Sequence, residues 1–175
     1  MEVIKVARMF TRMIRAAKLD PELYEEVEAD ESAFSEALVV VALSGVATMA
    51  GLAGRLNLRE LISGLVLGIL AWSGWSALVF FVGTRVCPEP QTRADWGELL
   101  RTTGFATTPA LLSILGIFPV LAGFITIVAS VWILLAFGVA VRQALDYHST
   151  LRAVAVCFVG WVVYTGILFS LMPRV

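Results

Sequence analysis

The stretch that decides the fold is TTGFATTPALLSILGIFPVLAGFITIVASVWILLAFGVAV, residues 102–141, which contains no Asp, Glu, Lys, Arg or His over 40 positions. A helix needs about 20 apolar residues to cross a membrane, so this stretch is long enough for two crossings. Its middle, residues 116–120, reads GIFPV, where proline lacks a backbone donor and glycine favours a turn. The stretch therefore predicts two membrane helices joined by a tight hairpin near Phe118.

Three further intervals without acidic or basic residues surround this stretch: residues 37–54, 61–84 and 153–173. Each is long enough for one membrane helix. We therefore predict an all-α fold, a polytopic membrane protein whose residues 33–175 form a membrane domain with five transmembrane helices. The predicted transmembrane helices are residues 33–54, 61–84, 100–117, 120–141 and 152–172.

The composition agrees with a membrane protein and excludes several other classes. Apolar residues make up 59% of the chain and charged residues 15%, and the mean hydropathy is +0.87. A net charge of −1 provides no basic surface for nucleic acid. Cys87, Cys157 and His148 are too few for a metal or disulfide framework and have no evident activating partner. We expect no catalytic residues, no metal, no cofactor and no enzymatic activity.

Residues 1–32 form a cytoplasmic N-terminal segment in this prediction, and their first part has the pattern of an amphipathic helix over residues 2–19. Basic residues recur three or four positions apart, and apolar residues occupy the opposite side. The basic residues are Lys5, Arg8, Arg12 and Arg15, and the apolar residues are Val3, Val6, Phe10, Met13 and Ala17. Such a helix is expected to lie in the membrane interface with its cations near anionic lipid headgroups.

Asp20 and Pro21 predict the start of a second, short acidic helix over residues 21–29, because aspartate is a good N-cap and proline suits the first helical position. Two interpretations of this helix remain open. Its acids offset the preceding cations in a solvated connector, or the helix presents a docking face for a partner protein. The docking residues would be Leu23, Tyr24 and Glu25.

The distribution of Lys and Arg predicts the orientation in the membrane. With the N-terminus in the cytoplasm, ten cations lie in or beside cytoplasmic segments and three lie on the other side. The cytoplasmic ten are Lys5, Arg8, Arg12, Arg15, Lys18, Arg85, Arg93, Arg101, Arg142 and Arg152; the other three are Arg55, Arg59 and Arg174. We therefore expect a cytoplasmic N-terminus and an external C-terminus.

The predicted membrane helices hold no ionisable residue at hydrocarbon depth, which argues against proton relays and charge-coupled pumps. Small residues are frequent instead. Gly64 and Gly68 form a small-x-x-x-small pattern that brings helices close together, either within one chain or at the contact face of a homo-oligomer.

Thr107 and Thr108 precede Pro109 in the third predicted membrane helix. Proline frees a backbone carbonyl of the preceding turn, and the hydroxyls can satisfy the exposed backbone groups, so the helix should be kinked there. The kink is either a packed structural bend or part of a neutral polar cavity.

Four short motifs occur in a specific order: LDPELYEEV at 19–27, WGELLR at 96–101, TGFATTP at 103–109 and LRA at 151–153. From about residue 6 to about residue 165 the chain resembles the Yip1 domain family, and its prokaryotic branch in particular. The resemblance implies a five-span integral protein with a cytosolic N-terminus. Eukaryotic members act in vesicle traffic and associate with each other and with prenylated Rab GTPases; their Asp-Leu-Tyr-Gly-Pro motif corresponds here to Leu23-Tyr24 followed by two glutamates.

The sequence therefore predicts a non-enzymatic protein of a prokaryotic cytoplasmic membrane that acts through assembly with itself or with another membrane protein, in membrane organisation or a trafficking-like process. The alternative is a channel, transporter or lipid-handling protein whose neutral cavity is lined by Thr107, Thr108 and Pro109.

Overall fold

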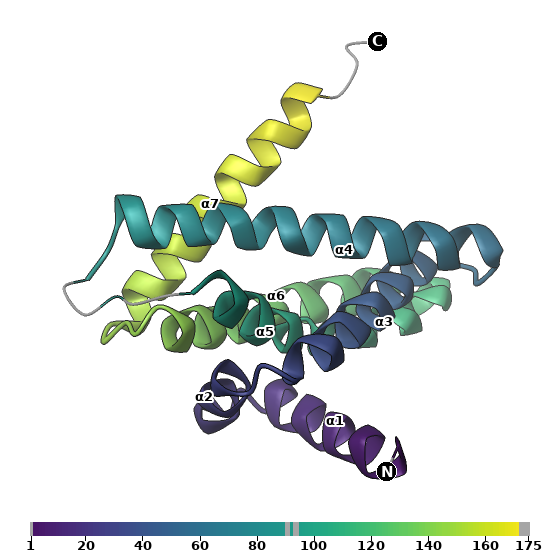
Figure 1. The fold of residues 1–175 in the computed structure, drawn as a ribbon. Coiled ribbons are helices and arrows are strands. Elements are labelled where there is room, and N and C mark those ends of the chain that lie inside the picture. The colour runs from purple at the N-terminus through teal and green to yellow at the C-terminus, as the bar shows by residue number, and fades with distance from the viewer. Residues whose placement is uncertain (1, 90–91, 93–94, 172–175) are drawn as a thin grey trace.

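The computed structural model describes residues 2–89, 92 and 95–171, with side chains between residues 5 and 163, and every regular element in this part of the chain is helical (Figure 1). The elements are α1 (Glu2–Ala17), α2 (Pro21–Ala29), α3 (Ala33–Ala53), α4 (Leu58–Phe81), a π-helical turn (Val82–Val86), α5 (Trp96–Ala106), a 3-10 helix (Thr108–Ile117), α6 (Pro119–Ala144) and α7 (Thr150–Leu171).

Three of these helices are long and apolar enough to cross a membrane: Ala33–Ala53, Leu58–Val86 and Pro119–Ala144. A shorter apolar helix covers Thr150–Val163. The prediction of an all-helical membrane protein is thereby confirmed. Arg93 and residue 172, the end of the last predicted membrane helix, lie outside the described residues.

Capping side chains set the helix starts. The Asp20 carboxylate accepts a hydrogen bond from the Glu22 N–H at 3.1 Å, and the Asn57 side chain accepts from the N–H groups of Arg59 and Glu60. Asp95 and Glu98 form a reciprocal capping box at the start of α5. Because these caps satisfy the first N–H groups, α4 and α5 begin before the residues 61 and 100 predicted from charge alone.

The third predicted membrane helix differs from the prediction: residues 100–117 are not one kinked α-helix. The α-helical part ends at Ala106, and a 3-10 helix follows from Thr108 to Ile117. Pro109 supplies no N–H to continue the α-helical pattern. The Thr107 and Thr108 hydroxyls donate to the carbonyls of Gly104 and Phe105, three residues back, so the tighter helix is favoured from this point.

The 3-10 helix gathers small residues on one side. Because it has three residues per turn, Ala110, Ser113 and Gly116 stand in one row. This row packs on α3 at Gly51, where a Cβ atom would collide with the Ser113 carbonyl oxygen. The tight contact fixes the 3-10 helix against α3, close to the hairpin at Phe118.

The helices α3 and α4 are in backbone contact. A Cβ atom on Gly64 would lie 2.6 Å from the Val46 Cα atom, and one on Gly68 would lie 2.8 Å from the Gly45 Cα atom. Gly64 and Gly68 therefore form a packing face within the chain, which is one of the two roles that the sequence left open.

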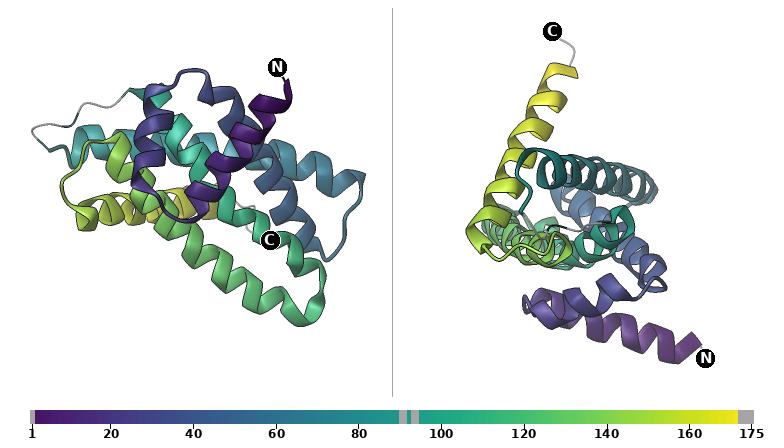
Figure 2. Two further views of the ribbon diagram at one scale, coloured as in Figure 1. Left: turned by 90° about the horizontal axis from the view of Figure 1, so that it is seen from below. Right: turned by 60° about the vertical axis from the view of Figure 1, so that its left-hand side comes forward.

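The helices α1 and α2 lie together against one side of the bundle of α3 to α6, and α7 crosses α4 on the other side (Figures 1 and 2). Buried residues of α7 occur in its first half, at Ala153, Val156 and Cys157. Further along, the C-terminal half of α7 projects away from the bundle (Figure 2, right).

Candidate functional site

Arg12 joins the N-terminal helices to the membrane domain. Its side chain is 5% exposed, and its guanidinium donates to Glu26 at 2.9 Å, to Asp30 at 2.8 Å and to Glu36 at 2.9 Å. Glu26 belongs to α2, Asp30 follows α2, and Glu36 lies in the first turn of α3. One planar guanidinium thus holds three segments together, as its fork of donors allows.

Two more arginines of α1 extend this ion-pair network. Arg8 donates to Glu36, and Arg15 pairs with Asp20 at 2.7 Å and with Glu26. Hydrogen bonds from Ser32 and Arg12 lower the pKa of Asp30 to about 2. Burial opposes the charged form of Arg12, but the three carboxylates outweigh it and raise the pKa of this residue. Arg12 and Asp30 are therefore both ionised at neutral pH.

Arg101 of α5 holds the end of α2. Its guanidinium donates to the Val27 carbonyl oxygen at 3.0 Å and to that of Glu28, and the residue is 8% exposed. Charge counting treats Arg101 as a loop cation and misses this role. A local signal existed, because α2 ends at Ala29 without a glycine C-cap and its last carbonyls need a donor from elsewhere.

Of the three predicted docking residues, two are buried and one is exposed. Leu23 and Tyr24 are fully buried against α1, α5 and α6, and the Tyr24 hydroxyl donates to the Ala16 carbonyl oxygen at 3.4 Å. Burial raises the pKa of Tyr24. Glu25 is exposed and accepts a hydrogen bond from Gln143 at 2.7 Å. Of the three, Glu25 alone is accessible to a partner in this conformation.

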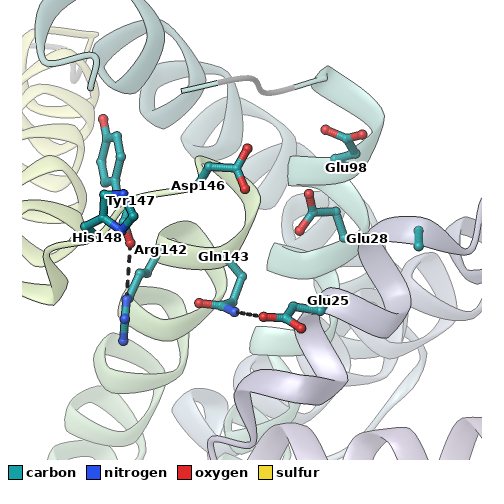
Figure 3. A pocket seen from close by; sticks show the side chains of 9 residues that line it. Glu25, Glu28, Glu98, Arg142, Gln143, Asp146, Tyr147 and His148 are labelled. Atoms are coloured by element: carbon teal, nitrogen blue, oxygen red, sulfur yellow. Dashed lines mark hydrogen bonds between the residues drawn. The ribbon is translucent and has the colours of Figure 1, made fainter. Parts of the chain in front are cut away.

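A cavity of about 620 Å³ lies beside Glu25, where three separate parts of the chain meet (Figure 3). These parts are α2, the start of α5, and the corner between α6 and α7. The lining residues are Glu25, Glu28, Ala29, Glu98, Arg142, Gln143, Asp146, Tyr147 and His148.

The cavity is electrically negative. Figure 3 shows the carboxylates of Glu28, Glu98 and Asp146 directed toward a common space. Partial burial, followed by repulsion from Glu98, Asp146 and Glu25, raises the pKa of Glu28 to about 7. Within the described residues, no three His, Cys, Asp or Glu side chains are placed to hold a metal ion. The negative charge of the lining residues favours cationic groups.

Hydrogen bonds fix the corner between α6 and α7 that forms one wall of this cavity. The Tyr147 hydroxyl donates to the carbonyl oxygens of Gly83 and Cys87, at 2.9 and 2.8 Å, and burial raises the pKa of Tyr147 to about 12. The backbone N–H of His148 donates to the Glu89 carboxylate at 3.1 Å. The connections α4–α5 and α6–α7 therefore lie at the same end of the bundle.

Cys87, which follows the π-helical turn, is exposed, and Cys157 in α7 is buried. A second, smaller cavity of about 240 Å³ lies between these elements and has mostly apolar walls. Val86, Cys87, Pro88, Arg152, Ala155, Val156 and Val159 line it.

The residues Thr107, Thr108 and Pro109 are used in packing. The Ser44 hydroxyl of α3 donates to the Thr107 carbonyl oxygen at 3.0 Å, and Thr108 and Pro109 are buried. Neither of the two cavities described above is lined by these three residues. Thr107 thus joins α3 to the start of the 3-10 helix.

The long apolar helices and the N-terminal segment docked on them define a multi-pass helical membrane protein. The sequence model of one family, the Yip1 domain, matches residues 19–172. The chain therefore belongs to the Yip1 domain family, as the order of its motifs predicts. No curated protein and no solved structure matches it.

Proposed function

We propose that the protein crosses the membrane five times, with its N-terminus in the cytoplasm and its C-terminus outside. The crossings are α3, α4, the combined α5 and 3-10 segment, α6 and α7. Two features support this orientation. Arg101 donates to the end of α2, Arg142 lines the acidic cavity beside α2, and Arg152 pairs with Glu89 near the same corner. The other end, near Gly51 and Gly116, carries the short connections at residues 54–57 and at Phe118.

The orientation is tested with reporters fused to each terminus in a bacterial cytoplasmic membrane. A fluorescent protein that matures only in the cytoplasm will be bright at the N-terminus and dark at the C-terminus, and alkaline phosphatase, which is active only outside, will show the reverse. The same signal from both termini would contradict an odd number of crossings.

We also propose that the protein is not an enzyme and that it recruits other proteins to the membrane through its cytoplasmic face. The observation that carries this part is the acidic cavity, because its walls come from α2, α5 and the α6–α7 corner and so form one surface. Glu25 and Glu28 supply part of its negative charge. A basic segment of a partner protein is the ligand that this charge favours.

We expect a lysine-rich peptide to bind the protein in nanodiscs of neutral lipid more tightly at pH 8 than at pH 6. As the pH rises through about 7, Glu28 ionises and adds a negative charge to the cavity. The variant Glu28→Gln should weaken binding at pH 8 by up to about fivefold and reduce the difference between the two pH values. Fluorescence anisotropy of the labelled peptide measures both effects.

Two variants serve as controls for this experiment. Glu31→Gln removes an exposed acid that does not line the cavity and should leave binding unchanged. His148→Gln replaces the single histidine, which does line it, so that any contribution from His148 is measured separately. Equal weakening by Glu31→Gln and Glu28→Gln would show general charge attraction and would contradict a docking site at the cavity.

A further inference from the structure

The helix α1 presents an apolar stripe that no other part of the described chain covers. Val6, Phe10 and Ile14 follow one another at four-residue spacing and are 47%, 52% and 57% exposed. The buried side of the same helix holds Met9 and Met13. A helix with this arrangement faces two apolar environments: the protein core on one side, and an external one along the stripe.

The arginines of α1 are paired with carboxylates of the same chain. Arg8, Arg12 and Arg15 pair with carboxylates of Asp20, Glu26, Asp30 and Glu36 within the chain. The amphipathic pattern in the sequence suggested that these cations contact anionic lipid headgroups. In the structure they hold α1 on α2 and α3, and their charge is compensated before any lipid approaches.

The C-terminal end of α1 lies against the middle of α6, next to exposed apolar residues of that helix. The Trp132 indole, midway along α6, donates to the Ala17 carbonyl oxygen at the end of α1 at 2.8 Å. Val131, the residue before Trp132, is 54% exposed. Leu135, one helical turn after Val131, is 51% exposed. An apolar medium that surrounds α6 therefore reaches the side on which α1 lies.

A second copy of the chain fits the stripe less well than lipid does. Stable protein interfaces bury about 600 Å² or more on each partner, which three half-exposed side chains in one row do not supply. Acyl chains need no such area, because each apolar side chain inserts independently.

We propose that Val6, Phe10 and Ile14 insert among the acyl chains of the adjacent leaflet, and that this contact responds to lipid packing and not to lipid charge. The proposal rests on the membrane orientation proposed above, in which the N-terminus lies on the cytoplasmic side. Amphipathic helices bind membranes through apolar burial and through attraction to anionic lipid. Because the arginines of α1 are paired internally, apolar burial is the larger contribution, beside the exposed lysines Lys5 and Lys18, and it grows where loosely packed lipids leave room for side chains.

The test uses the full chain with Cys87→Ser and Cys157→Ala, carrying one cysteine labelled with bimane at position 10 or position 11. Phe10→Cys lies in the stripe, and Thr11→Cys is the matched control, exposed on the adjacent polar side. In vesicles that contain lipids with a nitroxide on the acyl chain, we expect the label at position 10 to be quenched about twofold more strongly than the label at position 11. This quenching should be the same with neutral lipid and with about a third anionic lipid, and stronger with unsaturated than with saturated chains.

Three results would overturn the proposal. Equal quenching at both positions would show that the stripe does not face the acyl chains. Quenching at position 10 that requires anionic lipid would show a charge-driven contact. A disulfide between two chains of the unlabelled Phe10→Cys variant would show a second copy on the stripe. None of these changes the reporter assay or the peptide assay, so failure here is distinguishable from failure of the proposed function.

Discussion

Replacing Gly64 with leucine will lower the free energy of unfolding by about 3 kcal/mol, because the added side chain has no space between α3 and α4. A single Cβ atom at this position already lies 2.6 Å from the Val46 Cα atom and 2.7 Å from the Gly45 carbonyl oxygen. Both neighbours are backbone atoms, so no rotamer change relieves the collision, and the two helices must separate. Thermal or denaturant unfolding in mild detergent measures the loss, and Gly64→Ala should give a smaller change in the same direction.

The matched control is Gly123→Leu. Gly123 is also a helical glycine in an apolar segment, but a Cβ atom there would meet no heavy atom within 4 Å. This variant should unfold like the unmodified protein. If Gly64→Leu kept its stability and instead dissociated a homo-oligomer, the glycine face would be a contact between chains, contrary to the packing described here.

Replacing Arg12 with methionine will release α1 and α2 from the membrane domain. The change removes the cation that joins Glu26, Asp30 and Glu36, and leaves their carboxylates close together without it. Breaking a buried ion pair costs about 3 to 5 kcal/mol; since two of the three carboxylates are partly exposed, we expect a cost of about 2 to 3 kcal/mol. Hydrogen exchange of the amides in α1 and α2 should accelerate, while exchange in α3 and α4 changes little.

Two further variants decide whether the effect comes from the network. Lys18→Met removes an exposed cation of the same segment and should leave exchange unchanged. Arg12→Lys should recover only part of the protection, because an ammonium group lacks the planar fork that contacts three carboxylates. Full protection in Arg12→Met would mean that apolar packing of Leu23 and Tyr24 alone holds the segment in place.

Local chemistry in the sequence predicts several helix boundaries. Asp20 and Pro21 mark the start of α2, and the proline after Phe118 separates the 3-10 helix from α6. These positions depend on neighbouring residues, through a cap or a missing donor, so the sequence is sufficient to find them.

Contacts between residues far apart in the chain are not predictable from the sequence in this way. Nothing near Gly64 indicates that Gly45 will be its neighbour, and nothing near Arg101 indicates that it reaches the carbonyls of α2, 73 or more positions away. The same holds for Tyr24, whose surroundings in the sequence are acidic although its side chain is buried. The acidic cavity combines three segments, so no single one of them predicts it.

The 3-10 helix also changes how far a short segment of chain extends. Its ten residues rise about 2.0 Å each, and the eleven residues of α5 rise about 1.5 Å each, so together they cover about 36 Å. An α-helix would need about 24 residues for that distance. The 3-10 helix thus extends further along its axis than an α-helix with the same number of residues, and hydropathy windows based on α-helical rise underestimate its length.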